Sequence, residues 1–211
     1  MKLKFLITLI ACSLNAHAES PDKAATLAIA EKKVALCCAD KPKLGAAEVS
    51  DLSIYQINSS SKNHDGESVQ LVSLSGKIQV VTMGYSKCAY ACPRLMADMK
   101  AVQLGLPEEL RKKIGFNFFS VDPTDTPESL KSFGNSHKVN FDHWNFYSST
   151  PTTIQELAVV LGTKYRRIND KDFAHSNLLT VLNEKGEIIF RQEGLSGPAE
   201  PVIKAIVEAS K

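Results

Sequence analysis

The spacing of apolar and polar positions predicts an α/β order of elements from about residue 51 onward. We expect short strands at 51–57 and 68–74, separated by a polar stretch rich in turn-forming residues. The segment 77–85 is apolar at consecutive positions, which is typical of a strand buried on both faces. Another strand is expected at 116–121. The first half of this region therefore predicts the strands of a buried sheet.

Helix signals alternate with these strands. Apolar positions recur at helical spacing after Pro93: Leu95, Met99, Val102 and Leu106. Thr126 and Thr150 each precede a proline, and a capping threonine followed by a first-turn proline favours a helix start. Gly162 is a typical helix C-terminal glycine. The segment 176–194 predicts two strands around a tight turn, and 199–210 predicts a closing helix.

This order predicts a single folded domain at residues 51–211, an α/β sandwich in which helices flank a mixed central sheet. Residues 19–50 are rich in Ala and Lys and carry few large apolar side chains, so we interpret them as an N-terminal extension. The sequence shows no Gly-rich phosphate loop, internal repeat or low-complexity tract.

Residues 1–18 have the pattern of a secretory signal peptide: two lysines, an apolar run at 5–14, and Ala16-His17-Ala18 before the cleavage point. We therefore expect an exported, periplasmic protein. An alternative stays open, because Leu9-Ile10-Ala11-Cys12 resembles a bacterial lipobox, which would leave an acylated Cys12 at a membrane surface.

The net charge does not indicate a particular class of binding partner. The chain has 25 basic and 23 acidic residues, and removal of residues 1–18 takes away two lysines and no acid. A balanced protein has no net attraction for nucleic acid or anionic lipid. We therefore expect no nucleic-acid partner.

The mature chain keeps four cysteines, Cys37, Cys38, Cys88 and Cys92, which are too few for a disulfide scaffold. Cys88 and Cys92 lie between the strand at 77–85 and the next helix, where the helix N-terminus favours a thiolate. Residues four apart share one face near a helix start, so both sulfurs can bind one ion or close a disulfide. Location alone therefore does not separate redox from metal chemistry. Among metals, Cu(I) suits two soft thiolates, whereas structural zinc requires four ligands.

A third ligand would come from elsewhere in the chain. We interpret His64, in a polar loop, and His137, near a helix end, as solvated, and His143 as a packing or surface residue. His175 lies at the mouth of a buried strand after a loop. It is either structural or the partner of the two thiolates.

Three motifs together resemble the Sco/SenC family of copper chaperones, and the resemblance runs from about residue 52 to 194. They are Gly84-Tyr85 with Cys88, Cys92 and Pro93; the segment 120–130, SVDPTDTPESL; and the segment 174–188, AHSNLLTVLNEKGEI. The resemblance implies a thioredoxin-like fold with an N-terminal extension and an inserted hairpin, the latter compatible with 52–74. It also implies copper binding by Cys88, Cys92 and His175, and a role in building the dinuclear copper centre of cytochrome c oxidase.

Two functions from different classes therefore remain. The first is a copper chaperone that delivers Cu(I) or Cu(II) to the copper-bearing oxidase subunit, served by an upstream copper donor or a thiol reductant. The second is an enzyme, a thiol-disulfide oxidoreductase that uses Cys88 and Cys92 as its redox couple and keeps a partner's copper-ligand cysteines reduced. A redox-sensing module is a third alternative.

Other residues with suitable chemistry have simpler interpretations. Met83, Met96 and Met99 have the spacing of core residues rather than of copper ligands. Cys37 and Cys38 are interpreted as free thiols or a bridge to another chain, with an auxiliary copper-capture site as the alternative. Asp122 either supports the site from a strand end or caps a turn.

Overall fold

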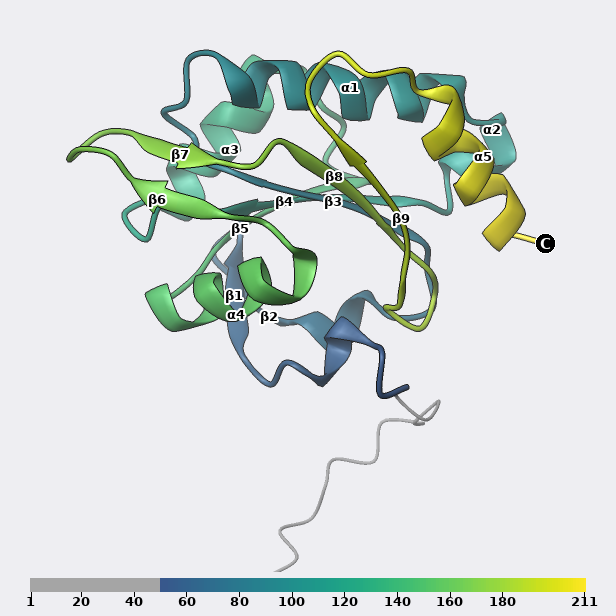
Figure 1. Ribbon diagram of the computed structural model, residues 1–211, viewed down its shortest axis with the longest axis horizontal. Helices are drawn as coiled ribbons and strands as arrows, with labels where there is room; N and C mark the ends of the chain where they lie inside the picture. The colour runs from purple at the N-terminus through teal and green to yellow at the C-terminus, as the bar shows by residue number, and fades with distance from the viewer. Residues whose placement is uncertain (1–49) are drawn as a thin grey trace, which may run out of the picture. The chain divides into compact units, whose positions relative to one another are not determined.

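A seven-stranded mixed sheet lies at the centre of the computed structural model, which describes residues 50–211 (Figure 1). The strand order is β2 (Ser68–Gln70), β1 (Ser60–Asn63), β5 (Trp144–Ser148), β4 (Gly115–Ser120), β3 (Gln79–Gly84), β8 (Leu178–Leu182) and β9 (Ile188–Glu193). β3, β4 and β5 are parallel, and the strands outside them pair antiparallel. A separate two-stranded hairpin is formed by β6 (Tyr165–Arg167) and β7 (Phe173–His175).

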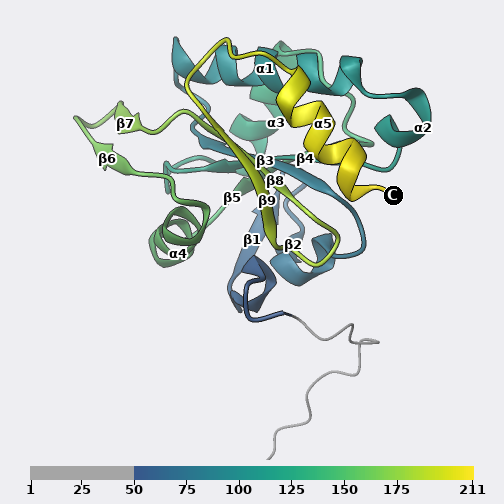
Figure 2. The same cartoon turned by 45° about the vertical axis from the view of Figure 1, so that its right-hand side comes forward.

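Helices cover both faces of the sheet. The helices are α1 (Ala91–Gly105), α2 (Glu108–Arg111), α3 (Pro127–Ser136), α4 (Pro151–Leu161) and α5 (Glu200–Ala209). Figures 1 and 2 show α1, α3 and α5 on one face of the sheet and α4 on the other. This is the predicted thioredoxin-like α/β sandwich, and the prediction of its fold class is confirmed. Among residues 50–211, no helix has the length and apolar character needed to cross a membrane.

The central strands are apolar because both of their faces are covered. Every residue of β3 is buried, and the aromatic side chains of β4 and β5 stack beside it, with the rings of Phe116 and Trp144 4.9 Å apart. The polar side chains in this core are paired: the Asn117 amide donates to Gln79 Oε1 at 2.7 Å. Since β3 and β4 run parallel, their carboxyl ends meet at one edge of the sheet. The Cys88 loop follows β3 at that edge.

The predicted helix boundaries agree well with the structure. α3 and α4 begin after Thr126 and Thr150, whose side chains accept hydrogen bonds from backbone N–H groups in the first turn. Gly162 ends α4 in the left-handed conformation, with φ of 76°. Pro93 lies in the first turn of α1, where a missing N–H costs nothing.

The predictions for the first two strands were wrong in part. Instead of a strand, 51–57 contains a 3-10 turn, η1 (Ile54–Gln56), because the Ser53 side chain accepts from the Tyr55 N–H and both Ile54 and Tyr55 are buried. A strand with one buried face cannot bury consecutive residues in this way. The second segment pairs only as far as Gln70 and then forms another 3-10 turn, η2 (Leu71–Leu74).

β1 instead lies in the polar stretch that we expected to be a loop. The inward-facing residues of β1 are Ser61 and Asn63, and both are hydrogen-bonded: Ser61 to Ser149 at 2.7 Å, and Asn63 to the Glu67 carboxylate at 2.9 Å. A strand whose buried side chains are polar leaves no alternating apolar pattern to read. β1 and β2 form a hairpin within 52–74, where the family resemblance places one.

Replacing the α4 capping residue tests how these helix starts stabilise the fold. Thr150→Ala removes the acceptor of the Thr153 N–H, so we expect the free energy of unfolding to fall by about 1 kcal/mol. Thr150→Ser keeps the hydroxyl and should lose much less. Urea denaturation followed by circular dichroism measures both variants, and equal losses would contradict a capping role.

Candidate metal centre

Two sulfur atoms meet where β3 ends and α1 begins. Cys92, in the first turn of α1, is fully buried, while Cys88 in the preceding loop is half-buried. The Tyr85 N–H points at Cys92 Sγ from 3.4 Å, and the Cys92 N–H points at Cys88 Sγ from 3.3 Å. The N-cap residue of α1, Tyr90, makes no side-chain capping bond, so the Cys88 sulfur takes the place of a capping acceptor. The helix start thereby favours negative charge on Cys88.

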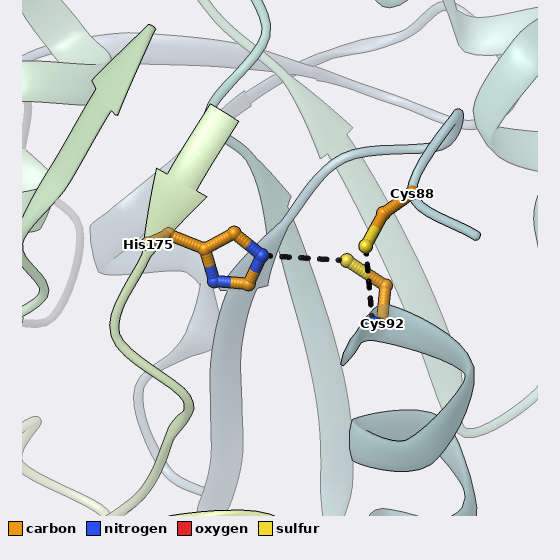
Figure 3. A group of neighbouring side chains, drawn as sticks. All are labelled: Cys88, Cys92 and His175. Carbon is orange, nitrogen blue, oxygen red and sulfur yellow. Dashed lines mark hydrogen bonds between the residues drawn. The ribbon is translucent and has the colours of Figure 1, made fainter. Parts of the chain in front are cut away.

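The β6–β7 hairpin brings an imidazole to these sulfurs. His175, opposite Tyr165 in the hairpin, places Nε2 3.6 Å from Cys92 Sγ (Figure 3). His175 Nδ1 lies 3.1 Å from the Ser176 carbonyl oxygen. Because a carbonyl only accepts, Nδ1 carries a proton, and Nε2 is the ring nitrogen that faces the sulfurs and would give its lone pair to a bound metal ion. The imidazole is therefore oriented for metal binding through Nε2.

Aromatic packing holds the hairpin against the cysteine loop. The Tyr85 ring lies 5.4 Å from the Phe173 ring and meets the His175 ring edge-on at 5.9 Å. The Arg167 guanidinium covers Phe173 at 5.3 Å. Tyr85 is part of a sequence motif, whereas no sequence pattern indicated a role for Phe173. Their contact is what joins the hairpin to the loop.

The sulfur–imidazole cluster, meaning Cys88, Cys92 and His175, is compact enough to hold one ion. Its three donor atoms all lie within 4.8 Å of one another. Donor atoms bound to one ion at about 2.0 to 2.3 Å lie roughly 3.5 to 4 Å from one another. The three donor atoms would therefore have to move only slightly closer together to bind one ion. Two sulfurs and one imidazole suit Cu(I) better than Mg²⁺ or Ca²⁺, which prefer oxygen. The donor set therefore fits copper.

The two thiols have opposite acid-base character. The Cys92 thiol donates to the Cys88 sulfur, which, together with His175 and nearby backbone N–H groups, overcomes the effect of burial and lowers the pKa of Cys88 to about 3. The same hydrogen bond, together with burial, raises the pKa of Cys92 far above its usual value. The metal-free reduced site therefore contains one thiolate and one thiol. The thiolate belongs to the more exposed sulfur.

Gly84, the last residue of β3, makes room for the buried sulfur. A Cβ at this position would lie 2.7 Å from Cys92 Sγ and 2.8 Å from the Phe118 ring. Real Cβ atoms do not approach other atoms this closely, so only glycine fits without moving Cys92. The glycine of the sequence motif thus has a packing role at the site.

The remaining candidate residues lie away from the cluster. His64, expected to be solvated, is only 6% exposed and packs against the Phe141 ring, with the ring centres 4.5 Å apart; that prediction was wrong. His64 is carried by the polar hairpin segment and packs on an aromatic ring from a distant part of the chain, which a local pattern does not reveal. His137 is half-buried beside Phe133, so its assignment as solvated was also wrong in part, and His143 is half-buried just before β5.

Other predictions for the site residues have mixed outcomes. Met83, Met96 and Met99 are buried in the core, as expected. Asp122 caps a turn, with Oδ1 accepting from the Thr124 N–H at 2.9 Å. Burial alone would raise the pKa of Asp122, but hydrogen bonds from Thr124 and the nearby Lys87 lower it overall. Cys12, Cys37 and Cys38 lie outside the described residues.

The chain is similar to known proteins in sequence and in fold. The family model SCO1/SenC matches residues 56–210. A candidate copper-binding protein of Stutzerimonas stutzeri is 23% identical over 120 residues, a match that spans 54% of this chain and 57% of that relative's length. The structure of Bradyrhizobium japonicum ScoI with copper bound is 23% identical, with a TM-score of 0.61, over 72% of this chain and 96% of that one.

A further solved structure is that of BsSco, described as a member of the Sco family of cytochrome c oxidase assembly proteins with a disulfide switch. It is 25% identical to this chain, with a TM-score of 0.64, and the match covers 73% of this chain and 95% of BsSco.

The charge state of Cys88 can be tested by alkylation. With its pKa near 3, Cys88 stays a thiolate at pH 5, where an ordinary thiol with a pKa of 9.0 is almost wholly protonated. We expect iodoacetamide to modify Cys88 at nearly equal rates at pH 7 and pH 5, measured by mass spectrometry, and Cys92 to remain unmodified. A rate that falls about tenfold per pH unit over this range, as for an unperturbed thiol, would contradict the assignment.

The same shift predicts a pH dependence of folding stability. Because the pKa of Cys88 is lower in the folded than in the unfolded chain, the contribution of its thiolate is complete above pH 9 and is lost as the pH falls toward 3. Cys88→Ser should remove that contribution. Urea titrations of both proteins across this range give the difference.

Substitution of Gly84 tests the packing of Cys92. Gly84→Ala forces Cys92 or Phe118 to move, so we expect a loss of about 1 to 3 kcal/mol in unfolding free energy. Gly105→Ala is the matched control, because its Cβ would meet only the flexible end of Ile203 and alanine favours a helix. Urea denaturation compares the two. If Gly84→Ala were as stable as Gly105→Ala, Cys92 would not depend on the glycine.

Proposed function

The chain belongs to the SCO1/SenC family, and we propose that it is a copper chaperone that binds one copper ion through Cys88, Cys92 and His175. The observation that carries this proposal is the convergence of two sulfurs and a correctly oriented imidazole within 4.8 Å. Copper is the cargo of such a protein, taken up from a donor and passed to an acceptor. The likeness to copper-bound ScoI supports this cargo.

We further propose that the acceptor is the copper-bearing subunit of cytochrome c oxidase, whose dinuclear centre needs delivered copper. The likeness to BsSco, a member of a family of oxidase assembly proteins, supports this partner. Export to the periplasm, through a signal peptide at residues 1–18, would place the domain at 51–211 beside that subunit. In the alternative, cleavage before Cys12 and acylation of that residue would leave residues 12–50 as the link to a membrane surface.

The cluster suits transfer by ligand exchange. Cys88 is already a thiolate and half-buried, so it can reach an incoming ion first. Cys92 then gives up its proton to become the second sulfur ligand, and His175 Nε2 adds the nitrogen. Release reverses these steps as an acceptor's thiolates replace the ligands one at a time. Oxidation of the two sulfurs to a disulfide stops binding, so an upstream thiol reductant is needed.

One observation favours the enzymatic alternative, a thiol-disulfide oxidoreductase. A half-exposed thiolate at Cys88 beside a buried thiol at Cys92 is also the arrangement of an attacking and a resolving cysteine. That function needs the sulfurs and not the lone pair of His175. The two proposals therefore differ in what His175 does.

Copper titration of the reduced, anaerobic protein tests the choice. We expect one tight equivalent, with a sulfur-to-copper charge-transfer band in the Cu(II) form. Cys88→Ser should abolish tight binding. Loss of a residue that only supports a metal ligand typically weakens binding by roughly 10- to 100-fold. His175→Ala removes a proposed ligand itself, so it should weaken copper binding by at least that factor. Competition with a chelator of known affinity measures each variant.

His143→Ala is the matched control, because His143 precedes β5 at the sheet edge opposite the cluster and should leave affinity unchanged. Absence of copper binding, together with disulfide exchange that persists in His175→Ala, would reject the chaperone and support the oxidoreductase.

A further inference from the structure

A buried carboxylate, Asp125, lies in the loop between β4 and α3 and accepts four hydrogen bonds. It is 5% exposed. Its Oδ2 accepts from the Ser86 backbone N–H at 2.9 Å and from Ser120 Oγ at 2.6 Å. Its Oδ1 accepts from Ser86 Oγ at 2.5 Å and from Ser129 Oγ at 3.3 Å. The donors come from the end of β4, from α3 and from the cysteine loop.

The bonds to Ser86 are the ones that reach the site. Ser86 is two residues before Cys88, and the Cys88 N–H donates back to the Tyr85 carbonyl at 3.3 Å. The loop thus turns immediately after the residue that Asp125 holds. Ser120 and Ser129, in contrast, belong to regular elements whose own backbone bonds keep them in place. Asp125 therefore connects a rigid edge of the fold to the short segment that carries Cys88.

A second buried acid in the same loop makes no such connection. Asp122, 2% exposed, bonds to Thr124 within its own turn. Toward the cysteine loop it meets only the end of the exposed Lys87 side chain, at 3.5 Å. The two acids are thus alike in charge and burial and differ in whether they hold the backbone near Cys88.

We infer that Asp125 is a positioning residue for the sulfur–imidazole cluster, because it fixes the backbone at Ser86 and so keeps Cys88 Sγ within reach of Cys92 and His175. Its role extends the proposed copper function, on which the copper part of the test rests. Loss of the carboxylate would leave the Ser86 backbone N–H and the Ser86 hydroxyl without an acceptor at the base of the loop. The loop would then sample positions in which the three donor atoms are no longer together.

The experiment compares Asp125→Ala with Asp125→Asn and Asp122→Ala, with two readouts. The first is amide hydrogen exchange of residues 86–88 in the reduced, metal-free full chain, with α5 amides as an internal reference for global stability. The second is copper affinity by chelator competition. Asparagine keeps an acceptor for the Ser86 N–H and an amide that can donate to the Ser86 hydroxyl, but it removes the charge.

For Asp125→Ala we expect exchange at 86–88 to become at least about tenfold faster, while α5 exchange changes much less. Copper affinity should fall by about tenfold or more. Asp125→Asn should stay within about threefold of the parent protein in both readouts, and Asp122→Ala should behave likewise. If Asp125 acts as a tether, meaning through its hydrogen bonds to Ser86, asparagine should restore both readouts. A purely electrostatic role predicts that asparagine does not restore them.

Three results would overturn the inference: unchanged exchange at 86–88 in Asp125→Ala, an Asp125→Asn variant as impaired as Asp125→Ala, or an equal loss in Asp122→Ala. If Asp125→Ala does not fold, Ser86→Ala decides, because it removes only the hydroxyl bond. It should speed exchange at 86–88 by a smaller factor of about threefold, and no change would again count against the tether. If the parent protein binds no copper, the proposed function fails, and the exchange data alone decide the role of Asp125.

Discussion

The burial of Cys92 against the end of β3 is the contact on which the rest of the site depends. Its sulfur fills the space that Gly84 leaves open, and the Tyr85 N–H points at it from 3.4 Å. This contact fixes the first turn of α1 against the buried strand. Once the turn is fixed, its N–H groups are directed at Cys88, whose thiolate character follows from them and from the Cys92 thiol. The acid-base asymmetry of the pair is therefore a consequence of packing.

The three donors are held with different rigidity. Cys92 belongs to a helix within the core, whereas Cys88 depends on a short loop and His175 on a two-stranded hairpin outside the main sheet. The loop is held by hydrogen bonds to Asp125, and the hairpin by the contact of Phe173 with Tyr85. One donor in the core with two on less extensive elements would suit the proposed transfer site, which has to bind an ion and release it. A cage of three core residues would bind but exchange slowly.

Sequence reasoning predicted what depends on local pattern and missed what depends on distant partners. The buried strands β3, β4 and β8, the helix starts at Thr126 and Thr150, and the strand–helix junction at Cys88 were visible in the order of residues. The β1 strand was not, because its inward side chains, Ser61 and Asn63, are polar and hydrogen-bonded, and so give no alternation of apolar residues. His64 was misjudged because Phe141, distant in sequence, covers it. His175 stood out from the sequence mainly through family resemblance, since the hairpin that delivers it is too short to predict.

The charge of the cluster gives a reason why one thiolate and one thiol are suitable for Cu(I). The two sulfurs of the metal-free site together carry one negative charge, because Cys88 is ionised and Cys92 is not. Binding of Cu(I) with release of the Cys92 proton exchanges one positive charge for another, so the total charge stays the same. Asp125, which bonds to the cysteine loop, is itself buried, and a change in the charge of the cluster next to a buried acid would be unfavourable. Exchange of a proton for Cu(I) makes no such change in charge, so the hydrogen bonds that position Cys88 can persist in both states.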